Sequence, residues 1–371
     1  MILYHSKPGV GDGMSFVQAL QSGIGTDGCD ITPKVKSPLP RPFFNNIAEM
    51  SSRDVAYVVT NAMMGSDFDA ETLRHLVNEW ITDDFELRQA GKSVYAFESL
   101  NGSTLSEYDL IGRLFAVLLR YLYDRRVVSI DTVFFSPSRG DSCAAISQAF
   151  QSVIGKSPVM IQVAGLLTEV EKRQLIHIVP HDMLYVTGCD EAALDRLSRR
   201  VKSMSHCNSI MIADCNPIAV VARVFMYFEA YRLLCIAGAE GKAVACADSS
   251  NPGDVMAAQV AIQLGLPIRL IQSEPICDIE DAILRAYKES CYIVCPRSAA
   301  QWDKLHADLR EGESGIFIQH NHPAKNRFLL EPLLNRVIAL PHKLHFDDVP
   351  HARYKRVAPS VNALKNCFIN Y

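Results

Sequence analysis

Small polar residues stand where one predicted strand leads into a predicted helix, in the segment Ser136-Pro-Ser-Arg-Gly-Asp-Ser142. The N-terminus of a helix offers unpaired N–H groups and the positive end of its dipole. Arg139 adds a fixed cation suited to a carboxylate or a phosphate. The segment therefore predicts anion binding, although an ordinary N-cap with a surface arginine explains the same residues.

A second segment with this layout is Ser249-Ser-Asn-Pro-Gly-Asp254, again between a predicted strand and a predicted helix. It is not a P-loop, because no Gly-Lys-Ser/Thr follows it. A plain turn between a strand and a helix also favours Asn, Pro, Gly and Asp. Two such loops in one protein strengthen the prediction of a site for an anionic ligand.

A third segment, Asn101–Asp109, precedes an apolar run from Leu110 to Leu122 that predicts a helix. Ser106 and Asp109 have the spacing of a capping box, with serine as N-cap and aspartate at the third helical position. This spacing places Tyr108 in the first helical turn. Taken alone, this context predicts that Tyr108 is an aromatic side chain packed beside the start of a helix.

The fourth segment is His320-Asn-His322-Pro-Ala-Lys325, directly after a predicted strand. Alternation along an extended chain would place both histidines on one face, as a metal pair requires. No Asp, Glu or Cys at a suitable spacing completes such a site. We therefore predict hydrogen-bonding or core histidines and no metal.

Elements that alternate between strand and helix must position these segments. Residues 1–92 carry helical patterns around a proline-rich stretch at 37–42, and alternation begins near residue 93. Strands are predicted at Val127–Phe135, Pro158–Val163, Met183–Thr187, Ser209–Ala213, Ala243–Ala247, Ile268–Ile271 and Gly315–Gln319, with helices between them. This order predicts parallel βαβ units, whose ligands bind at the carboxyl ends of the strands.

Composition narrows the class of protein. Hydrophobic residues make up 49% and charged residues 21% of 371 residues, and the formal net charge is −4, so we expect a globular protein without a nucleic-acid partner. No apolar run is long enough for a membrane span, and the N-terminus lacks a secretory signal. The 11 cysteines, none in CxxC spacing, indicate reduced thiols. We expect a cytoplasmic monomer or homodimer.

Taken in order, the segments resemble threonine synthase, a fold-type II enzyme that depends on pyridoxal phosphate (PLP). Phe97-Glu-Ser-Leu-Asn-Gly-Ser-Thr-Leu105 resembles the family's Phe-His-Gly-Pro-Thr-Leu, and Ser138-Arg-Gly-Asp-Ser142 resembles its Thr-Ser-Gly-Asp-Thr. Asn251-Pro-Gly-Asp254 resembles its phosphate loop, and His322-Pro-Ala-Lys325 matches its His-Pro-Ala-Lys. The resemblance runs nearly end to end. It implies an α/β fold of the tryptophan synthase β type, with two open, mostly parallel sheets and a mostly helical N-terminal segment.

The departures from the family fall on its reactive positions. The family continues Thr-Leu-Ala-Phe-Lys-Asp, and its lysine forms the imine with PLP, whereas this chain reads Thr104-Leu-Ser-Glu-Tyr-Asp109. A phenol cannot form an imine. His320 stands where the family has a threonine opposite the pyridine nitrogen, and Ser250 and Arg139 replace a glycine and a small hydroxyl residue. We therefore expect no cofactor, or PLP bound without a covalent link.

These features lead to one function and two alternatives. We expect an enzyme that works without PLP, by proton transfer such as elimination or group transfer, on a small amino-acid-derived or phosphorylated substrate between two domains. The alternatives are a pseudoenzyme that binds a metabolite and a residual PLP-dependent lyase. The candidate acid–base residues are Tyr108, Glu107 and His320. The candidate ligand-binding residues are Ser138, Arg139, Asp141, Ser142, Asn216, Ser249, Ser250, Asn251, Gly253, Asp254 and Lys325. Predicted domains are 1–92, a smaller one at 93–235 and a larger one at 236–371.

Overall fold

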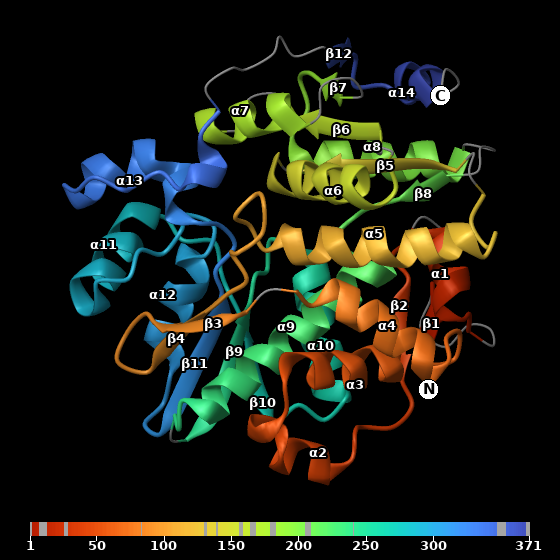
Figure 1. Cartoon of the computed structure of the whole chain (residues 1–371). Helices are drawn as coiled ribbons and strands as arrows, with labels where there is room; N and C mark the ends of the chain where they lie inside the picture. The colour runs from red at the N-terminus through yellow and green to blue at the C-terminus, as the bar shows by residue number, and fades with distance from the viewer. Residues whose placement is uncertain are drawn as a thin grey trace.

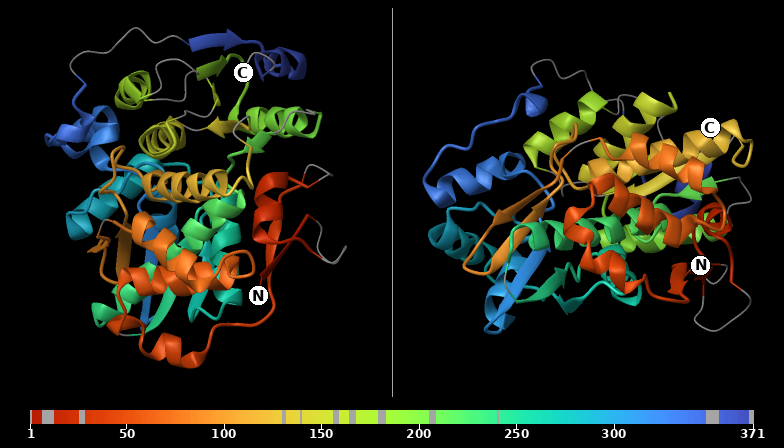
Figure 2. Two further views of the ribbon diagram at one scale, coloured as in Figure 1. Left: turned by 45° about the vertical axis from the view of Figure 1, so that its right-hand side comes forward. Right: turned by 60° about the horizontal axis from the view of Figure 1, so that its bottom comes forward.

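The fold is taken from a computed structural model of the chain. The structure describes residues 2–6, 13–25, 29–82, 84–129, 132–138, 140–155, 159–163, 168–178, 183–204, 209–239, 241–346 and 354–368. Two sheets of five strands stand one above the other, and the long helix α5, Tyr108–Asp124, crosses between them (Figure 1). The turned views of Figure 2 keep α5 between the sheets.

The first sheet has the order β10-β9-β11-β4-β3. Its strands are β3 Glu86–Gln89, β4 Val94–Glu98, β9 Lys242–Ala247, β10 Ile268–Gln272 and β11 Glu313–Ile318. All neighbours are parallel except β3, which is antiparallel to β4. Strand β11 is buried along its whole length, as expected of the central strand in a sheet covered on both faces.

The second sheet has the order β12-β7-β6-β5-β8, and all its neighbours are parallel. Its strands are β5 Val133–Ser138, β6 Val159–Val163, β7 Met183–Val186, β8 Ser209–Met211 and β12 Tyr354–Val357. A small antiparallel pair, β1 Ile2–His5 with β2 Thr32–Val35, lies near the N-terminus.

Helices connect the strands and cover the sheets. They are α1 Phe16–Ser22, α2 Arg41–Asn45, α3 Ser52–Met64, α4 Ala70–Trp80, α6 Gly140–Val153, α7 Glu169–Ile178, α8 Glu191–Met204, α9 Pro217–Ile236, α10 Pro252–Gln263, α11 Ile279–Ser290, α12 Ala299–Asp308, α13 Arg327–Leu334 and α14 Val361–Phe368. Short 3₁₀ turns are η1 Ile47–Glu49, η2 Pro323–Asn326 and η3 His342–Leu344. Helix α12 packs on strands of the first sheet, and α9 packs on α3, α5 and α10.

The prediction of an α/β, fold-type II architecture is confirmed, with shifts at several element ends. The strand predicted from Val127 begins only at Val133, and Ser136–Ser138 extend it instead of forming a loop. Helix α5 begins at Tyr108 with Glu107 as its N-cap, one residue later than the predicted N-cap Ser106, and only half of the predicted capping box forms. The Asp109 carboxylate accepts from the Ser106 N–H, whereas the Ser106 hydroxyl bonds Thr104 Oγ1 and does not cap the helix.

The two sheets interleave along the chain. Strand β4 pairs with β11, which comes after residue 241, and β12 returns from the C-terminal end to the sheet of β5–β8. The predicted domain boundaries after residues 92 and 235 stay a prediction.

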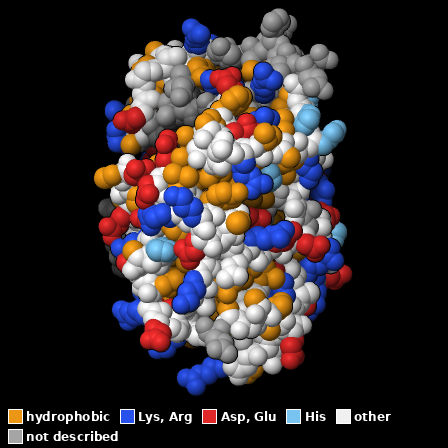
Figure 3. Space-filling model, turned by 90° about the vertical axis from the view of Figure 1, so that its left-hand side faces the viewer, with side chains coloured by type: hydrophobic (Ala, Val, Ile, Leu, Met, Phe, Trp, Pro, Cys, Tyr) orange, Lys and Arg blue, Asp and Glu red, His pale blue; other side chains and the backbone are white. Residues whose placement is uncertain are grey.

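The surface carries no large region of one charge on the face shown in Figure 3, where acidic and basic side chains alternate. This agrees with the small net charge of −4. Among the described helices, none is both long and apolar enough to cross a membrane.

Helices α5 and α6 pack closely at Gly112. A Cβ atom added there would lie 2.9 Å from the carbonyl oxygen of Ala145, which is backbone and cannot rotate away. Replacing Gly112 therefore forces the two helices apart.

We expect Gly112→Val to lower the free energy of unfolding by about 1–3 kcal/mol, because inserted methyl groups overpack the contact. Gly112→Ala should also destabilise, although alanine favours a helix by ~1 kcal/mol over glycine. Urea unfolding measures both. Asn78→Ala, on the exposed face of α4, is the control for helix propensity alone. A Gly112→Ala variant as stable as the wild type would refute the close packing.

Candidate functional site

Three neighbouring parallel strands deliver three polar side chains to one place. Strands β4, β11 and β9 lie side by side, and their carboxyl ends lead to Glu107, His320 and Asp248 respectively. The Glu107 N–H donates to the His320 carbonyl at 3.0 Å, which fixes the two loops against each other. The site thus forms where parallel sheets usually bind ligands.

The three side chains form a buried row. His320 Nδ1 lies 2.7 Å from Glu107 Oε1, and His320 Nε2 lies 3.5 Å from Asp248 Oδ2. Because a carboxylate only accepts, Nδ1 carries the hydrogen of the first contact. Glu107 Oε2 and His320 Nε2 are buried without a hydrogen-bond partner among the described residues. Such atoms are rare in folded proteins and mark places where a polar ligand can bond.

Electrostatics keeps both carboxyl groups of the row ionised. Burial raises the pKa of Glu107, but His320, Arg223 and Arg297 together bring it below its ordinary value. For Asp248, burial also acts to raise the pKa, and His320 and Ser250 more than offset it, so the pKa is lowered. The imidazole therefore stands between two negative charges, which suits it to hold and release a proton.

Tyr108 belongs to a second cluster, beside the row. Its hydroxyl donates to Asp214 Oδ1 at 3.0 Å, and Arg223 pairs with the same oxygen at 2.9 Å. The Arg223 guanidinium carbon lies 5.4 Å from the centre of the Tyr108 ring. Burial raises the pKa of Tyr108, and the charge of Asp214 acts in the same direction, so the phenol stays protonated.

Two predicted ligand-binding residues bind each other. Lys325, in η2, forms an ion pair with Asp141, near the start of α6, and both side chains are buried. The Lys325 ammonium also donates to the Thr104 carbonyl at 3.0 Å. The pair therefore joins the loops of one sheet to a helix of the other.

The predicted phosphate loop is bonded within itself. The N–H groups of Gly253 and Asp254 donate to Asn251 Oδ1 at 3.1 and 3.2 Å, and that of Ser250 donates to Asp248 Oδ1 at 2.9 Å. Ser249 N donates to Ser273 Oγ. These amides are engaged in the described conformation, so an anion there would have to displace side-chain oxygens.

Other predicted residues have structural roles or lie outside the description. Asn216 caps α9 by accepting from the Ile218 N–H. Asp254 accepts from the Tyr227 hydroxyl at 2.8 Å, and burial together with the charge of Glu107 raises its pKa to about 6. Ser142 lines a small cavity beside Tyr108. Arg139 and the side chain of Ser138 lie outside the described part of the chain.

Sequence reasoning missed four members of the site: Asp214, Arg223, Asp248 and Arg297. Three of them had a readable signal: Asp248 follows β9 directly, and Asp214 lies shortly after β8. Arg223 is a charged residue inside the apolar helix α9, which is itself a signal of a buried ion pair. Arg297 lies in the connection between α11 and α12, where the sequence offered no pattern.

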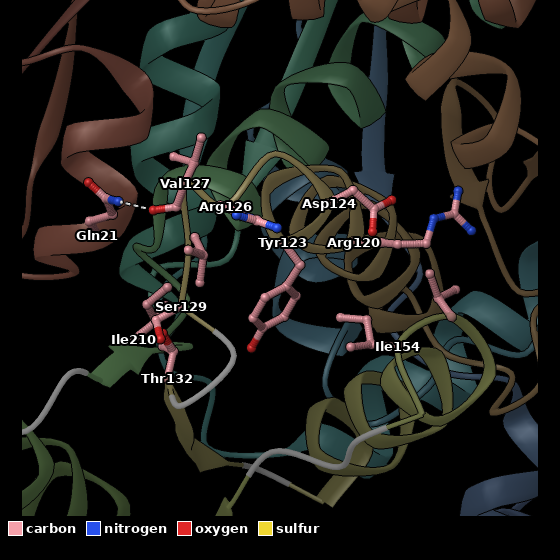
Figure 4. Close-up of a pocket in the computed structure, with 12 residues that line it drawn as sticks. Gln21, Arg120, Tyr123, Asp124, Arg126, Val127, Ser129, Thr132, Ile154 and Ile210 are labelled. Atoms are coloured by element: carbon pink, nitrogen blue, oxygen red, sulfur yellow. Dashed lines mark hydrogen bonds between the residues drawn. The ribbon is translucent and has the colours of Figure 1, made fainter.

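Two cavities meet at Asp214. An outer pocket of about 350 Å³ and an inner cavity of about 20 Å³ beside Tyr108 share Pro137, Ala213 and Asp214 as walls. The outer pocket therefore lies next to the small cavity that Tyr108 lines. A wider hollow of about 960 Å³ lies elsewhere, at the C-terminal end of α5, with Tyr123, Arg126 and Ile154 among its walls (Figure 4).

Comparison with known proteins places these features in context. No protein-family profile matches the chain. Threonine synthase of Haemophilus influenzae is 22% identical, over 89% of this chain and 91% of that protein. The crystal structure of threonine synthase from Escherichia coli matches with a TM-score of 0.87 at 19% identity, over 100% of both chains.

A third comparison overturns the prediction that no cofactor is expected. The threonine synthase of Brucella melitensis, solved with PLP bound, matches with a TM-score of 0.80 at 16% identity, over 100% of this chain and 99% of that chain. This match points to PLP as the cofactor rather than to the absence of a cofactor. Tyr108 fits that cofactor poorly. The aldehyde of PLP needs an amine to form an imine, and Tyr108 offers a protonated phenol.

The segments that carried the resemblance lie together in space. Ser106 forms an isolated bridge with Asn321, and Lys325 contacts Thr104 and Asp141. The motifs around residues 104, 141 and 325 therefore meet at one cleft, as the order of the motifs implied.

Among the described residues, no group of three or more His, Cys, Asp or Glu side chains could hold a metal ion. In sequence and in fold, the chain is similar to threonine synthases over nearly its whole length.

Proposed function

We propose that this chain is an enzyme that moves a proton on a small, amino-acid-derived anion in the cleft between its two sheets. One observation carries the proposal. The row Glu107–His320–Asp248 is buried, contains two ionised carboxylates, and leaves His320 Nε2 and Glu107 Oε2 without a hydrogen-bond partner among the described residues. A histidine held in this way is suited to general acid–base work.

Each residue has a distinct role in the proposal. Glu107 accepts from Nδ1 and so orients the imidazole, and His320 Nε2 takes the proton from a carbon of the substrate. The electron pair of the broken C–H bond then forms a double bond. The leaving group departs with the electron pair of its own bond to the substrate. Tyr108, which donates to Asp214 and keeps its proton, positions Asp214 and is not the base.

The lysine of the family is replaced by Tyr108 in this proposal. Within the described residues, the buried lysine of the cleft is Lys325, and its ammonium is held by Asp141 and the Thr104 carbonyl. An ammonium in an ion pair is a poor nucleophile, because the charged form has no free electron pair. PLP supplies an electron sink to carbanions when it is bound, and the residues named here would act beside it.

A second candidate is a metabolite-binding protein without turnover. Tyr108 at the position of the family's lysine favours this reading, because a protonated phenol cannot form the imine. Ligand-induced stabilisation without turnover would distinguish it from the enzyme. Cytoplasmic location and a monomer or homodimer stay predictions for both.

We expect His320→Gln to lose about 10²–10⁴-fold in kcat, because the amide keeps a hydrogen bond but transfers no proton. The assay uses O-phosphohomoserine, O-phosphoserine and O-acetylserine, with and without added PLP, and follows release of phosphate, acetate and ammonia. His75→Gln, on the exposed face of α4, is the matched control. Wild-type turnover that survives His320→Gln within two-fold would rule out the assigned role.

Tyr108→Lys should restore an imine with PLP, because it returns an amine to the start of α5. Absorbance in the visible range, followed by borohydride reduction and peptide mapping, locates the adduct. We expect labelling at position 108 in the variant and none at this position in the wild type or in Tyr108→Phe. Wild-type protein labelled at Lys325 to a similar extent would refute the assignment of position 108 as the lost attachment point.

A further inference from the structure

Among the described residues Arg297 has no ion-pair partner, unlike the cations Arg223 and Lys325. Its guanidinium carbon lies 6.0 Å from the centre of the Tyr108 ring, and its Nη2 atom is buried without a hydrogen bond among the described residues. Arg223, by comparison, is paired with Asp214 at 2.9 Å, and Lys325 is paired with Asp141. Arg297 is half-buried as a residue, and a buried donor atom without a hydrogen bond is costly, so a fold that retains one has a reason to do so.

The segment that carries Arg297 is fixed to the catalytic row. The hydroxyl of the next residue, Ser298, donates to the Ile318 carbonyl at 3.0 Å and accepts from the His320 N–H at 3.1 Å. Cys295 N donates to Gln319 Oε1 at 3.3 Å. Arg297 is thus held in register with His320, and the guanidinium is positioned before any ligand binds.

The charges around Arg297 keep it ionised. Burial lowers the pKa of Arg297, but Tyr108, Glu107, Asp141 and Asp248 together raise it well above its ordinary value. None of these carboxylates lies within 4.0 Å of the guanidinium among the described residues, so their charges act at a distance and leave its hydrogen-bond donors to a ligand.

We propose that Arg297 receives the carboxylate of the substrate, placing the adjoining carbon beside His320 Nε2. A planar guanidinium matches a carboxylate with two parallel hydrogen bonds. The negative charges of Glu107 and Asp248 nearby favour a singly charged carboxylate over a doubly charged phosphate. The inference rests on the proposed function for its substrate class, but binding can be measured without turnover.

The test measures binding of L-serine and L-homoserine, each paired with its carboxamide, and of inorganic phosphate to the full chain by calorimetry. We expect the amino acids to bind and the carboxamides to bind at least 10-fold more weakly. Arg297→Gln should weaken amino-acid binding about 10- to 100-fold, because it removes a charged hydrogen-bond pair. Arg297→Lys keeps the charge but not the planar pair of donors. Its affinity for the amino acids should lie between that of the wild type and that of Arg297→Gln.

Arg88→Gln, on the exposed strand β3, is the matched control and should bind as the wild type does. Urea unfolding of each variant without ligand separates lost binding from lost folding. The inference is overturned by equal binding of acid and carboxamide, by full binding in folded Arg297→Gln, by stabilisation with phosphate alone, or by no binding of either amino acid.

The two proposals fail in different ways. If amino acids bind through Arg297 but no substrate of the assay turns over, the proton-transfer function fails and the carboxylate site stands. If His320→Gln abolishes turnover while Arg297→Gln binds and turns over normally, the carboxylate site fails and the proton-transfer function stands.

Discussion

The hydrogen bond between Glu107 and His320 holds the cleft together, because every other polar group there is arranged around it. It joins the loops after β4 and β11 at their side chains, while the backbone contact between the same two residues joins them again. The ionised Glu107 carboxylate buried at this place needs compensation, since an unpaired buried charge is unfavourable by several kcal/mol. His320 and the arginines Arg223 and Arg297 provide that compensation.

The same principle explains why Tyr108 can occupy a position next to so many charges. A phenol is neutral when buried, so it adds no charge to the cluster, and its hydroxyl satisfies Asp214. Arg223 sits over the ring and bonds the same carboxylate, so one arginine serves a hydrogen bond, an ion pair and a ring contact at once. The residue that replaces the amine of the family is thereby a structural part of the site.

The sequence predicted the strands β5 to β11 because their apolar periodicity is local, whereas β1 to β4 and β12 were not among its predictions. It also placed Tyr108 at the start of a helix and His320 after a strand, and the structure has both there. Whether Ser249–Asp254 binds a ligand or bonds within itself could not be read from composition, because an asparagine that caps a helix and one that contacts an anion look alike. The role of Arg297 could not be predicted for a different reason, because it depends on neighbours that are distant in sequence.

The order of strands in the first sheet has a consequence for how the protein is made. Its central strand, β11, spans Glu313–Ile318, whereas its edge strand β3 is complete by Gln89. During synthesis β3 and β4, which pair with each other, emerge long before β11, with which β4 also pairs, so the apolar faces of β4 stay uncovered until then. Contacts between residues so far apart also slow folding. A ribosome-bound chain of this protein therefore depends on protection from aggregation until most of it has been translated.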